Sequence, residues 1–308
     1  MSKATQQMLE QFRLIRDQAI RRSEAHFRHL TETAGGTSPY LWPTATLIRR
    51  KAATLQMADR ALDALVAEEE ARGEKAVERL LAEVRPALLR REQTAPPAEE
   101  GARPSMARLL DTQVIQWDAI TQPNPAHLYA PFATPGPDPV DAATLHLRAA
   151  VRGQNPLAHK ERTWAWTEAY LSWYTFPESG SESFALPLTL DLHGHYLCRP
   201  GWMPPDGPGA ATCSLTVSTN VYRFTRPGAP PHEDGWLTTP VLPQPADALG
   251  YWGRIDETRA FTRVTQVGRH ELLVLLARVE LLARAEGIGS YAELDLATPT
   301  FGYIKAAV

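Results

Sequence analysis

The sequence predicts an α+β protein in which an N-terminal α-helical hairpin of coiled-coil type precedes an antiparallel β-sandwich of jelly-roll type. Two observations support this prediction. Apolar residues recur every three or four positions over residues 3–91, whereas they alternate with polar residues in most later segments. A stretch rich in proline and glutamate separates the two patterns. We therefore expect a helical arm over residues 1–93, a linker over 94–105 and a β-sandwich domain over 106–308.

Two amphipathic helices make up the predicted arm. The first spans residues 3–32 and the second spans 44–91, where Gly73 is either a tolerated helical glycine or a break and Pro86 marks a kink. The apolar stripe of the first helix consists of Met8, Phe12, Ile15, Ala19, Phe27 and Leu30. Such a stripe is too narrow for a globular core, so we expect the helices to pack on each other. A membrane-inserting helix is the alternative, but it favours a basic polar face, and here glutamate is mixed with arginine.

Residues 270–287 have the composition of a helix but the periodicity of a strand. Their later charged residues would scatter around a helix but share one face of a strand: Arg278, Glu280, Arg284 and Glu286. Apolar residues occupy the odd positions between them. We therefore predict a long strand, which a turn joins to a C-terminal strand in a hairpin.

The same alternation predicts further strands. Four aromatic residues share one face over residues 164–174, and hydroxyl residues oppose apolar ones over 213–224. More strands are expected near residues 112–120, 144–151 and 260–267. Proline- and glycine-rich loops separate these segments without helical crossovers, which is typical of an antiparallel sandwich.

Asp191, His193 and His195 form a candidate metal site. On a strand over residues 188–196 the leucines face the core, so these three side chains share the opposite face. Imidazole and carboxylate ligands suit zinc or non-haem iron. The H-x-H pattern resembles that of the cupins, which lies on a jelly-roll strand, and the resemblance implies a metalloenzyme. It stops after the two histidines, because the cupin pattern continues with a glutamate and this chain continues YLCRPGW.

Two alternatives follow for this strand face. Further metal ligands would have to come from distant positions: His146, His232, His270 or Glu168. Otherwise the three side chains are solvated polar groups that bond to water and to a neighbouring strand.

The two cysteines, Cys198 and Cys213, share the parity of the apolar residues on their strands. We therefore expect them to meet across a hairpin. They form either a disulfide or, because the chain begins without a secretory signal pattern, two buried thiols. A thiol that faces the core lacks the exposure that a reactive thiol needs.

Four tryptophans lie in predicted loops and are candidate binding residues: Trp42, Trp202, Trp236 and Trp252. A loop tryptophan either packs beneath its loop or contacts a sugar ring or a partner protein. A simple meander places Trp202 and Trp236 at opposite ends of the sandwich, so they need not share one site.

Composition narrows the partners and the location. A net charge of −3 with 22% charged residues argues against nucleic acid as a partner. No apolar run reaches the roughly 20 residues of a membrane-spanning helix, and the N-terminus does not resemble a signal peptide. We therefore expect a cytoplasmic protein, with export by a route that needs no signal left open.

The sequence contains no nucleophile elbow, phosphate-binding loop or dinucleotide fingerprint. We expect a non-enzymatic structural or binding protein without a cofactor. Its helical arm would form a homo-oligomer or hold a protein partner, and its sandwich would present a binding surface to a partner or a carbohydrate. The alternatives are a pore-forming toxin with membrane-active helices and a receptor-binding sandwich, and a cupin-like metalloenzyme that uses Asp191, His193 and His195.

Overall fold

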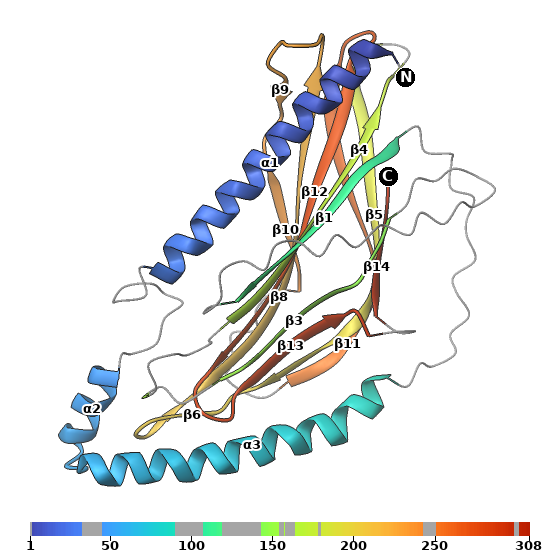
Figure 1. Ribbon diagram of the computed structural model, residues 1–308. Coiled ribbons are helices and arrows are strands. Elements are labelled where there is room, and N and C mark those ends of the chain that lie inside the picture. Colours follow the sequence, from blue (N-terminus) through green and yellow to red (C-terminus); the bar gives the residue numbers. More distant parts are fainter. Residues whose placement is uncertain are drawn as a thin grey trace.

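The computed structural model describes residues 2–32, 45–89, 107–118, 143–153, 157, 164–177, 180–242, 251–298 and 302–308. The predicted linker over 94–105 and Trp42 lie outside these residues. The helices are α1 (Lys3–Glu32), α2 (Ala45–Thr54) and α3 (Asp59–Leu89) (Figure 1). The first helix has its predicted bounds, whereas a turn divides the second predicted helix into α2 and α3. None of the described helices is long and apolar enough to cross a membrane.

Sheet A has the strand order β1-β4-β12-β8-β10, with β9 paired to β8. Its strands are β1 (Arg108–Asp118), β4 (Trp164–Thr175), β8 (Ala210–Phe224), β9 (His232–Glu233), β10 (Leu237–Leu242) and β12 (Leu272–Glu286). The pairings are antiparallel, and β12 lies in the centre, hydrogen-bonded to β4 on one side and to β8 on the other.

Sheet B has the strand order β2-β14-β5-β13-β3, with β11 paired to β5. Its strands are β2 (Ala143–Leu145), β3 (Leu147–Arg152), β5 (Ser181–Arg199), β11 (Tyr251–Val267), β13 (Tyr291–Leu296) and β14 (Tyr303–Ala307). A short ribbon of β6 (Trp202–Met203) and β7 (Gly207–Pro208) follows β5. The mixture of helices and antiparallel sheets confirms the α+β class.

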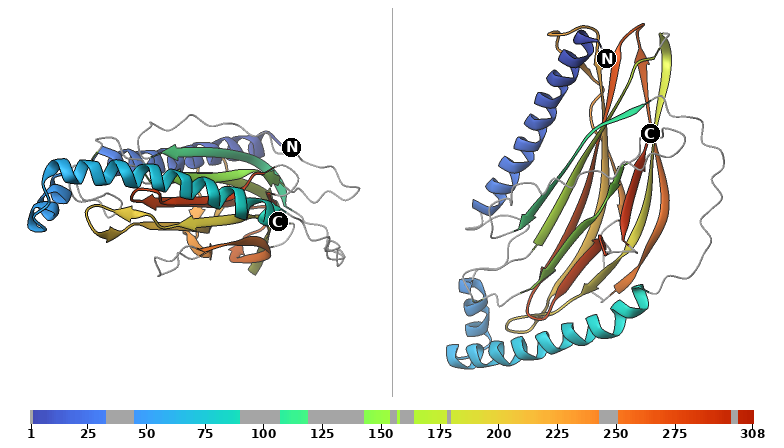
Figure 2. Two further views of the ribbon diagram at one scale, coloured as in Figure 1. Left: turned by 90° about the horizontal axis from the view of Figure 1, so that it is seen from below. Right: turned by 45° about the vertical axis from the view of Figure 1, so that its right-hand side comes forward.

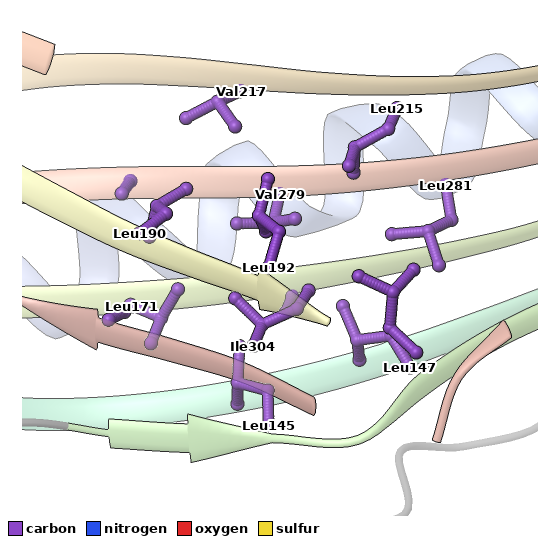
Figure 3. Close-up of a cluster of buried hydrophobic side chains, with 14 of the residues drawn as sticks. Leu145, Leu147, Leu171, Leu190, Leu192, Leu215, Val217, Val279, Leu281 and Ile304 are labelled. Atoms are coloured by element: carbon purple, nitrogen blue, oxygen red, sulfur yellow. The ribbon is translucent and has the colours of Figure 1, made fainter. Parts of the chain in front are cut away.

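The main hydrophobic core lies between the two sheets. It combines leucines of β5 in sheet B, such as Leu190 and Leu192, with Leu215 of β8 and Leu281 of β12 in sheet A (Figure 3). These residues occupy alternate positions on their strands, as expected when one side of each strand faces a core. The opposite side of each sheet is its outer face.

The strand predicted over residues 270–287 is confirmed as β12. Its odd residues, including Val279 and Leu281, lie in the core between the sheets. Its first even residues, from Leu272 to Leu276, are buried on the outer face, and charged residues follow from Arg278 onward. The residues of β12 have high helix propensity, so burial of both strand faces in hydrophobic clusters outweighs that propensity.

Helix α1 covers the apolar part of the outer face of sheet A. Met8, Leu9 and Phe12 pack with Leu272 and Tyr222 in a second hydrophobic cluster. The amphipathic stripe of α1 is therefore buried against a sheet.

Helices α2 and α3 cover the end of the molecule at the β6–β7 ribbon and part of the outer face of sheet B (Figure 2). Leu62 and Val66 pack with Ile288, while Val77 and Leu88 pack with Leu197 and Tyr291.

At Gly73 the backbone of α3 meets the backbone of the turn at 287–290, since a Cβ there would lie 2.6 Å from the Cα of Gly289. Gly73 is thus a helical glycine required by close approach, and α3 also continues through Pro86 without ending.

The predicted coiled-coil hairpin is not confirmed. The buried residues of α1 and α3 belong to different clusters, and the two helices lie apart in Figure 1 and in the right-hand view of Figure 2. The physical reason is that the outer sheet faces carry apolar residues of their own, so each narrow helical stripe is buried on a sheet.

Two predicted hairpins are also corrected. Strand β13 does not pair with β12; it pairs with β3 and β5, because the turn at 287–290 carries the chain from sheet A to sheet B. Gly287 and Gly289 have positive φ angles in that turn, which favour glycine. Cys198 and Cys213 do meet, with 3.4 Å between their sulfur atoms, but as free thiols on strands of different sheets.

Candidate functional site

The outer face of sheet A carries a cluster of polar residues beside α1. Glu168 on β4 is the cross-strand partner of Glu280 on β12, and Tyr170 is the partner of Arg278. Side chains of such partners start from Cβ atoms about 5 Å apart. The alternation of β4 and β12 therefore brings two carboxyl groups, a phenol and a guanidinium together. We name Glu168, Tyr170, Arg278 and Glu280 the Arg278 cluster.

Arg278 joins the two carboxyl groups of this cluster. Its Nη1 lies 3.7 Å from Oε1 of Glu168, and its Nη2 lies 3.5 Å from Oε2 of Glu280. Tyr170 donates a hydrogen bond of 3.0 Å to Glu168, and the hydroxyl of Ser23 on α1 lies 3.1 Å from the Tyr170 oxygen. One guanidinium thus forms ion pairs with two carboxyl groups, and α1 adds only the neutral hydroxyl of Ser23.

Burial raises the pKa of Glu168 to about 7, although the charge of Arg278 acts in the opposite direction. The nearby Glu280 adds to the increase, because a second negative charge disfavours ionisation. Burial and Glu168 also raise the pKa of Tyr170. Glu168 is 0% exposed, so it is a buried carboxyl that gains or loses a proton close to neutral pH.

Trp236 extends this cluster to the surface. The guanidinium carbon of Arg278 lies 5.7 Å from the centre of the Trp236 ring, a cation–π distance, and Trp236 is 41% exposed. Hydroxyl groups lie on neighbouring strands, where Ser218 and Thr238 are 2.8 Å apart. Thr216 donates a hydrogen bond to Glu280 over 3.2 Å. The surface therefore combines an aromatic ring with donors and acceptors of hydrogen bonds.

A second polar cluster lies on the outer face of sheet B beneath α3. Glu293 on β13 accepts hydrogen bonds from Nη2 of Arg85 on α3 at 2.7 and 2.8 Å, and from the Tyr291 hydroxyl. Arg148 on β3 lies 3.3 Å from the same carboxylate, and Nε2 of His195 lies 3.5 Å from it. We name the five residues Arg85, Arg148, His195, Tyr291 and Glu293 the Glu293 cluster.

The Glu293 carboxylate is held in its charged form. Burial alone would raise its pKa, but hydrogen bonds from His195 and Tyr291 and the charges of Arg148 and Arg85 outweigh burial and lower the pKa to about 2. Arg254 adds a second tie between α3 and sheet B by donating to the carbonyl of Leu88 over 3.0 Å. The cluster therefore fastens α3 to the sheet.

His195, Glu293 and Asp295 bring three metal-type ligand atoms within 4.8 Å of one another, the one such group among the described residues. The two carboxylates of this group already have other partners. Asp295 accepts from the backbone N–H groups of Ala297 and Thr298 at 2.8 and 2.9 Å, and Glu293 accepts from Arg85. A cation would have to displace guanidinium groups of like charge, so the arrangement fits an ion-pair network better than a metal centre.

The predicted metal ligands are not brought into one cluster. Asp191 accepts a hydrogen bond of 2.7 Å from Thr258. His193 lies 2.7 Å from Asp256 through Nδ1 and packs on the Tyr303 ring. His195 is 0% exposed, which contradicts the expectation that it is solvated; α3 covers this end of the strand face.

The described candidate tryptophans lie at three separate places. Trp202 forms a β-bridge with Ile288 and packs in the cluster beneath α2 and α3. Trp236 belongs to the surface at Arg278, and Trp252 is 52% exposed on β11 of sheet B.

The Arg278 cluster was not predicted as a site. From the sequence, Arg278 and Glu280 are expected on the polar face of a strand, and Glu168 is only a possible distant metal ligand. The sequence does show that Arg278 and Glu280 lie on the same face of their strand. It does not show that β4 pairs with β12, and this pairing brings Glu168 to them.

The chain matches no protein-family model, and no curated protein is similar to it in sequence.

Proposed function

We propose that the protein is a non-enzymatic binding protein and that it binds a carbohydrate chain at the surface around Trp236. Its two sheets, which share one core, would form a β-sandwich of jelly-roll type that serves as the scaffold. The binding surface would be the part of the outer face of sheet A that carries Trp236, Arg278, Glu280 and Thr238.

One observation supports the proposal above the others: Trp236 is 41% exposed while its ring is held by Arg278. An indole ring offers a rigid apolar plane on which one face of a sugar can stack. Sugar hydroxyls need both donors and acceptors. Arg278 beside the ring, its ion-pair partner Glu280 and Thr238, two residues further along the chain, would supply them.

The paired carboxyl groups of Glu168 and Glu280 invite a comparison with glycoside hydrolysis, which uses two such groups around the scissile bond. A general acid must come within about 3 Å of the leaving oxygen. Glu168 is 0% exposed and is bonded to Tyr170 and Arg278, so a substrate on the surface does not reach it. Glu168 therefore positions Arg278, and binding without hydrolysis is the proposal.

The test compares two exposed tryptophans on opposite sheets. A panel of soluble oligosaccharides is titrated into the wild-type protein, Trp236→Ala and Trp252→Ala, and binding is measured by calorimetry. We expect at least one oligosaccharide to bind the wild type, with affinity reduced tenfold or more in Trp236→Ala and unchanged in Trp252→Ala. Absence of binding across the panel, or equal losses in both variants, would contradict the proposal.

A second variant separates binding from folding. Glu280→Gln keeps the shape of the side chain but removes its charge, and we expect it to weaken the same oligosaccharide without lowering the urea midpoint by more than the equivalent of about 0.5 kcal/mol. Unchanged affinity in Glu280→Gln would place the ligand elsewhere on the molecule.

A further inference from the structure

Strand β11 is a long edge strand. It is 17 residues long and pairs with β5 along its length, and among the described strands it has no partner on its other side. The edge of sheet A at β10 is interrupted by Pro240 and an adjacent register shift, whereas β11 contains no proline and its register shift lies near its end, between Thr265 and Val267. The backbone N–H and C=O groups along β11 are therefore available to another strand.

Two-fold symmetry restricts how a second copy can pair with β11. Backbone groups and side chains both alternate with a period of two, so an antiparallel partner must place residues of equal parity opposite each other. The symmetry axis must consequently lie midway between one residue of β11 and the same residue of the second copy. An axis at Arg254, Asp256, Glu257, Arg259 or Arg263 would put a charged side chain opposite its own copy, which disfavours all five positions.

An axis at Thr258 gives the opposite result. Glu257 of each copy then lies opposite Arg259 of the other, which creates two pairs of opposite charge. Both side chains are about half exposed, at 47% and 49%. The same axis places Trp252 opposite Val264, two large apolar residues that are 52% and 59% exposed in the single chain.

We propose that β11 pairs with β11 of a second copy of this chain, antiparallel and centred on Thr258, so that sheet B continues through both copies. The partner is identified by the two-fold complementarity of charge and apolar contact along one strand. This interface uses the edge of sheet B, so it does not depend on carbohydrate binding at Trp236.

Charge exchange across the axis tests both the interface and its register. The mass in solution of the full chain is measured by light scattering at micromolar concentration, where we expect a dimer of twice 34.1 kDa. Glu257→Arg should weaken dimerisation tenfold or more, because it places arginine opposite arginine. The double variant Glu257→Arg, Arg259→Glu should restore the dimer, since opposite charges face each other again.

Glu68→Arg on the exposed face of α3 is the matched control, and it should leave the dimer intact. A monomeric wild type, a dimer insensitive to Glu257→Arg, or failure of the double variant to recover would each overturn the proposal.

A cross-linking measurement keeps the register falsifiable if a charge variant misfolds. Thr258→Cys places two thiols opposite each other on the axis, within reach of a disulfide after mild oxidation removes two electrons and two protons. We expect a linked dimer for Thr258→Cys and none for Thr262→Cys, whose two copies would be several residues apart. Equal cross-linking at both positions would contradict the register.

Discussion

Two buried glutamates, one on the outer face of each sheet, are held in opposite states. Glu168 and Glu293 are both 0% exposed, both are bonded to a tyrosine, and both lie beside a helix. Yet the pKa of Glu168 is raised to about 7, and that of Glu293 is lowered to about 2. Both side chains are shielded from solvent, so solvent exposure alone does not explain the difference.

Hydrogen bonds from His195 and Tyr291 lower the pKa of Glu293, and the number of neighbouring positive charges adds to the difference. In the Glu293 cluster two guanidinium groups approach one carboxylate, and α3 supplies one of them through Arg85. In the Arg278 cluster one guanidinium is shared between Glu168 and Glu280, and α1 supplies the Ser23 hydroxyl. A proton on Glu168 compensates for the missing charge. The Glu293 cluster therefore stabilises the packing of α3 on sheet B. In the Arg278 cluster, Glu168 can still gain or lose a proton near neutral pH, close to the exposed Trp236 ring.

The largest effect is expected from Glu293→Gln. The amide cannot balance Arg85 and Arg148, so the free energy of unfolding should fall by about 3 kcal/mol, as when one partner of a buried ion pair is removed. Urea unfolding at pH 7 measures this loss. The matched control is Glu68→Gln in the exposed pair with Arg72, which should change the value by less than about 0.5 kcal/mol. Equal losses of unfolding free energy in the two variants would show that the Glu293 ion pairs do not stabilise the fold more than an exposed pair does.

Glu168→Gln should have the opposite sign. The pKa of Glu168 is higher in the folded chain than its ordinary 4.5, so wild-type stability falls as pH rises from about 4.5 to about 7 and stays low above that. The neutral amide avoids this cost. We expect the variant to gain about 2 kcal/mol over the wild type at pH 8 and little at pH 4. Urea unfolding at both pH values checks this, and destabilisation at pH 8 would remove the contrast between the two sites.

A smaller effect should follow from Gly73→Ala, which tests how closely α3 is held. In a free helix this change stabilises by about 1 kcal/mol. Here the new Cβ would lie 2.6 Å from Gly289, so we expect a net loss of about 1–2 kcal/mol, measured by thermal unfolding. A gain in stability would mean that α3 does not dock against the turn at 287–290.

Much of the fold could be predicted from local patterns. The bounds of α1 and the strand character of β12 follow from periodicity, because each buries faces that the sequence marks with apolar residues. The partners of those faces could not be predicted. The stripe of α1 fits another helix as well as a sheet, and the turn after β12 fits a hairpin as well as a crossing to the second sheet.

The sites were predicted less well for the same reason. The alternation in β12 showed that Arg278 and Glu280 share a face, but only the register with β4 places Glu168 opposite Glu280. The pattern at His193 and His195 suggested a pair of ligands, yet α3 covers one of them and leaves the other 28% exposed. Both outcomes depend on contacts between residues far apart in the sequence.

The most direct test of the contrast between the two clusters is a carbon-13 NMR titration of the glutamate carboxyl groups in the wild-type protein. Glu168→Gln and Glu293→Gln assign the two signals. We predict that the Glu168 signal titrates with a midpoint near pH 7 and that the Glu293 signal still reports a carboxylate at pH 4. Two signals that both titrate close to the ordinary pKa of 4.5 would contradict the account.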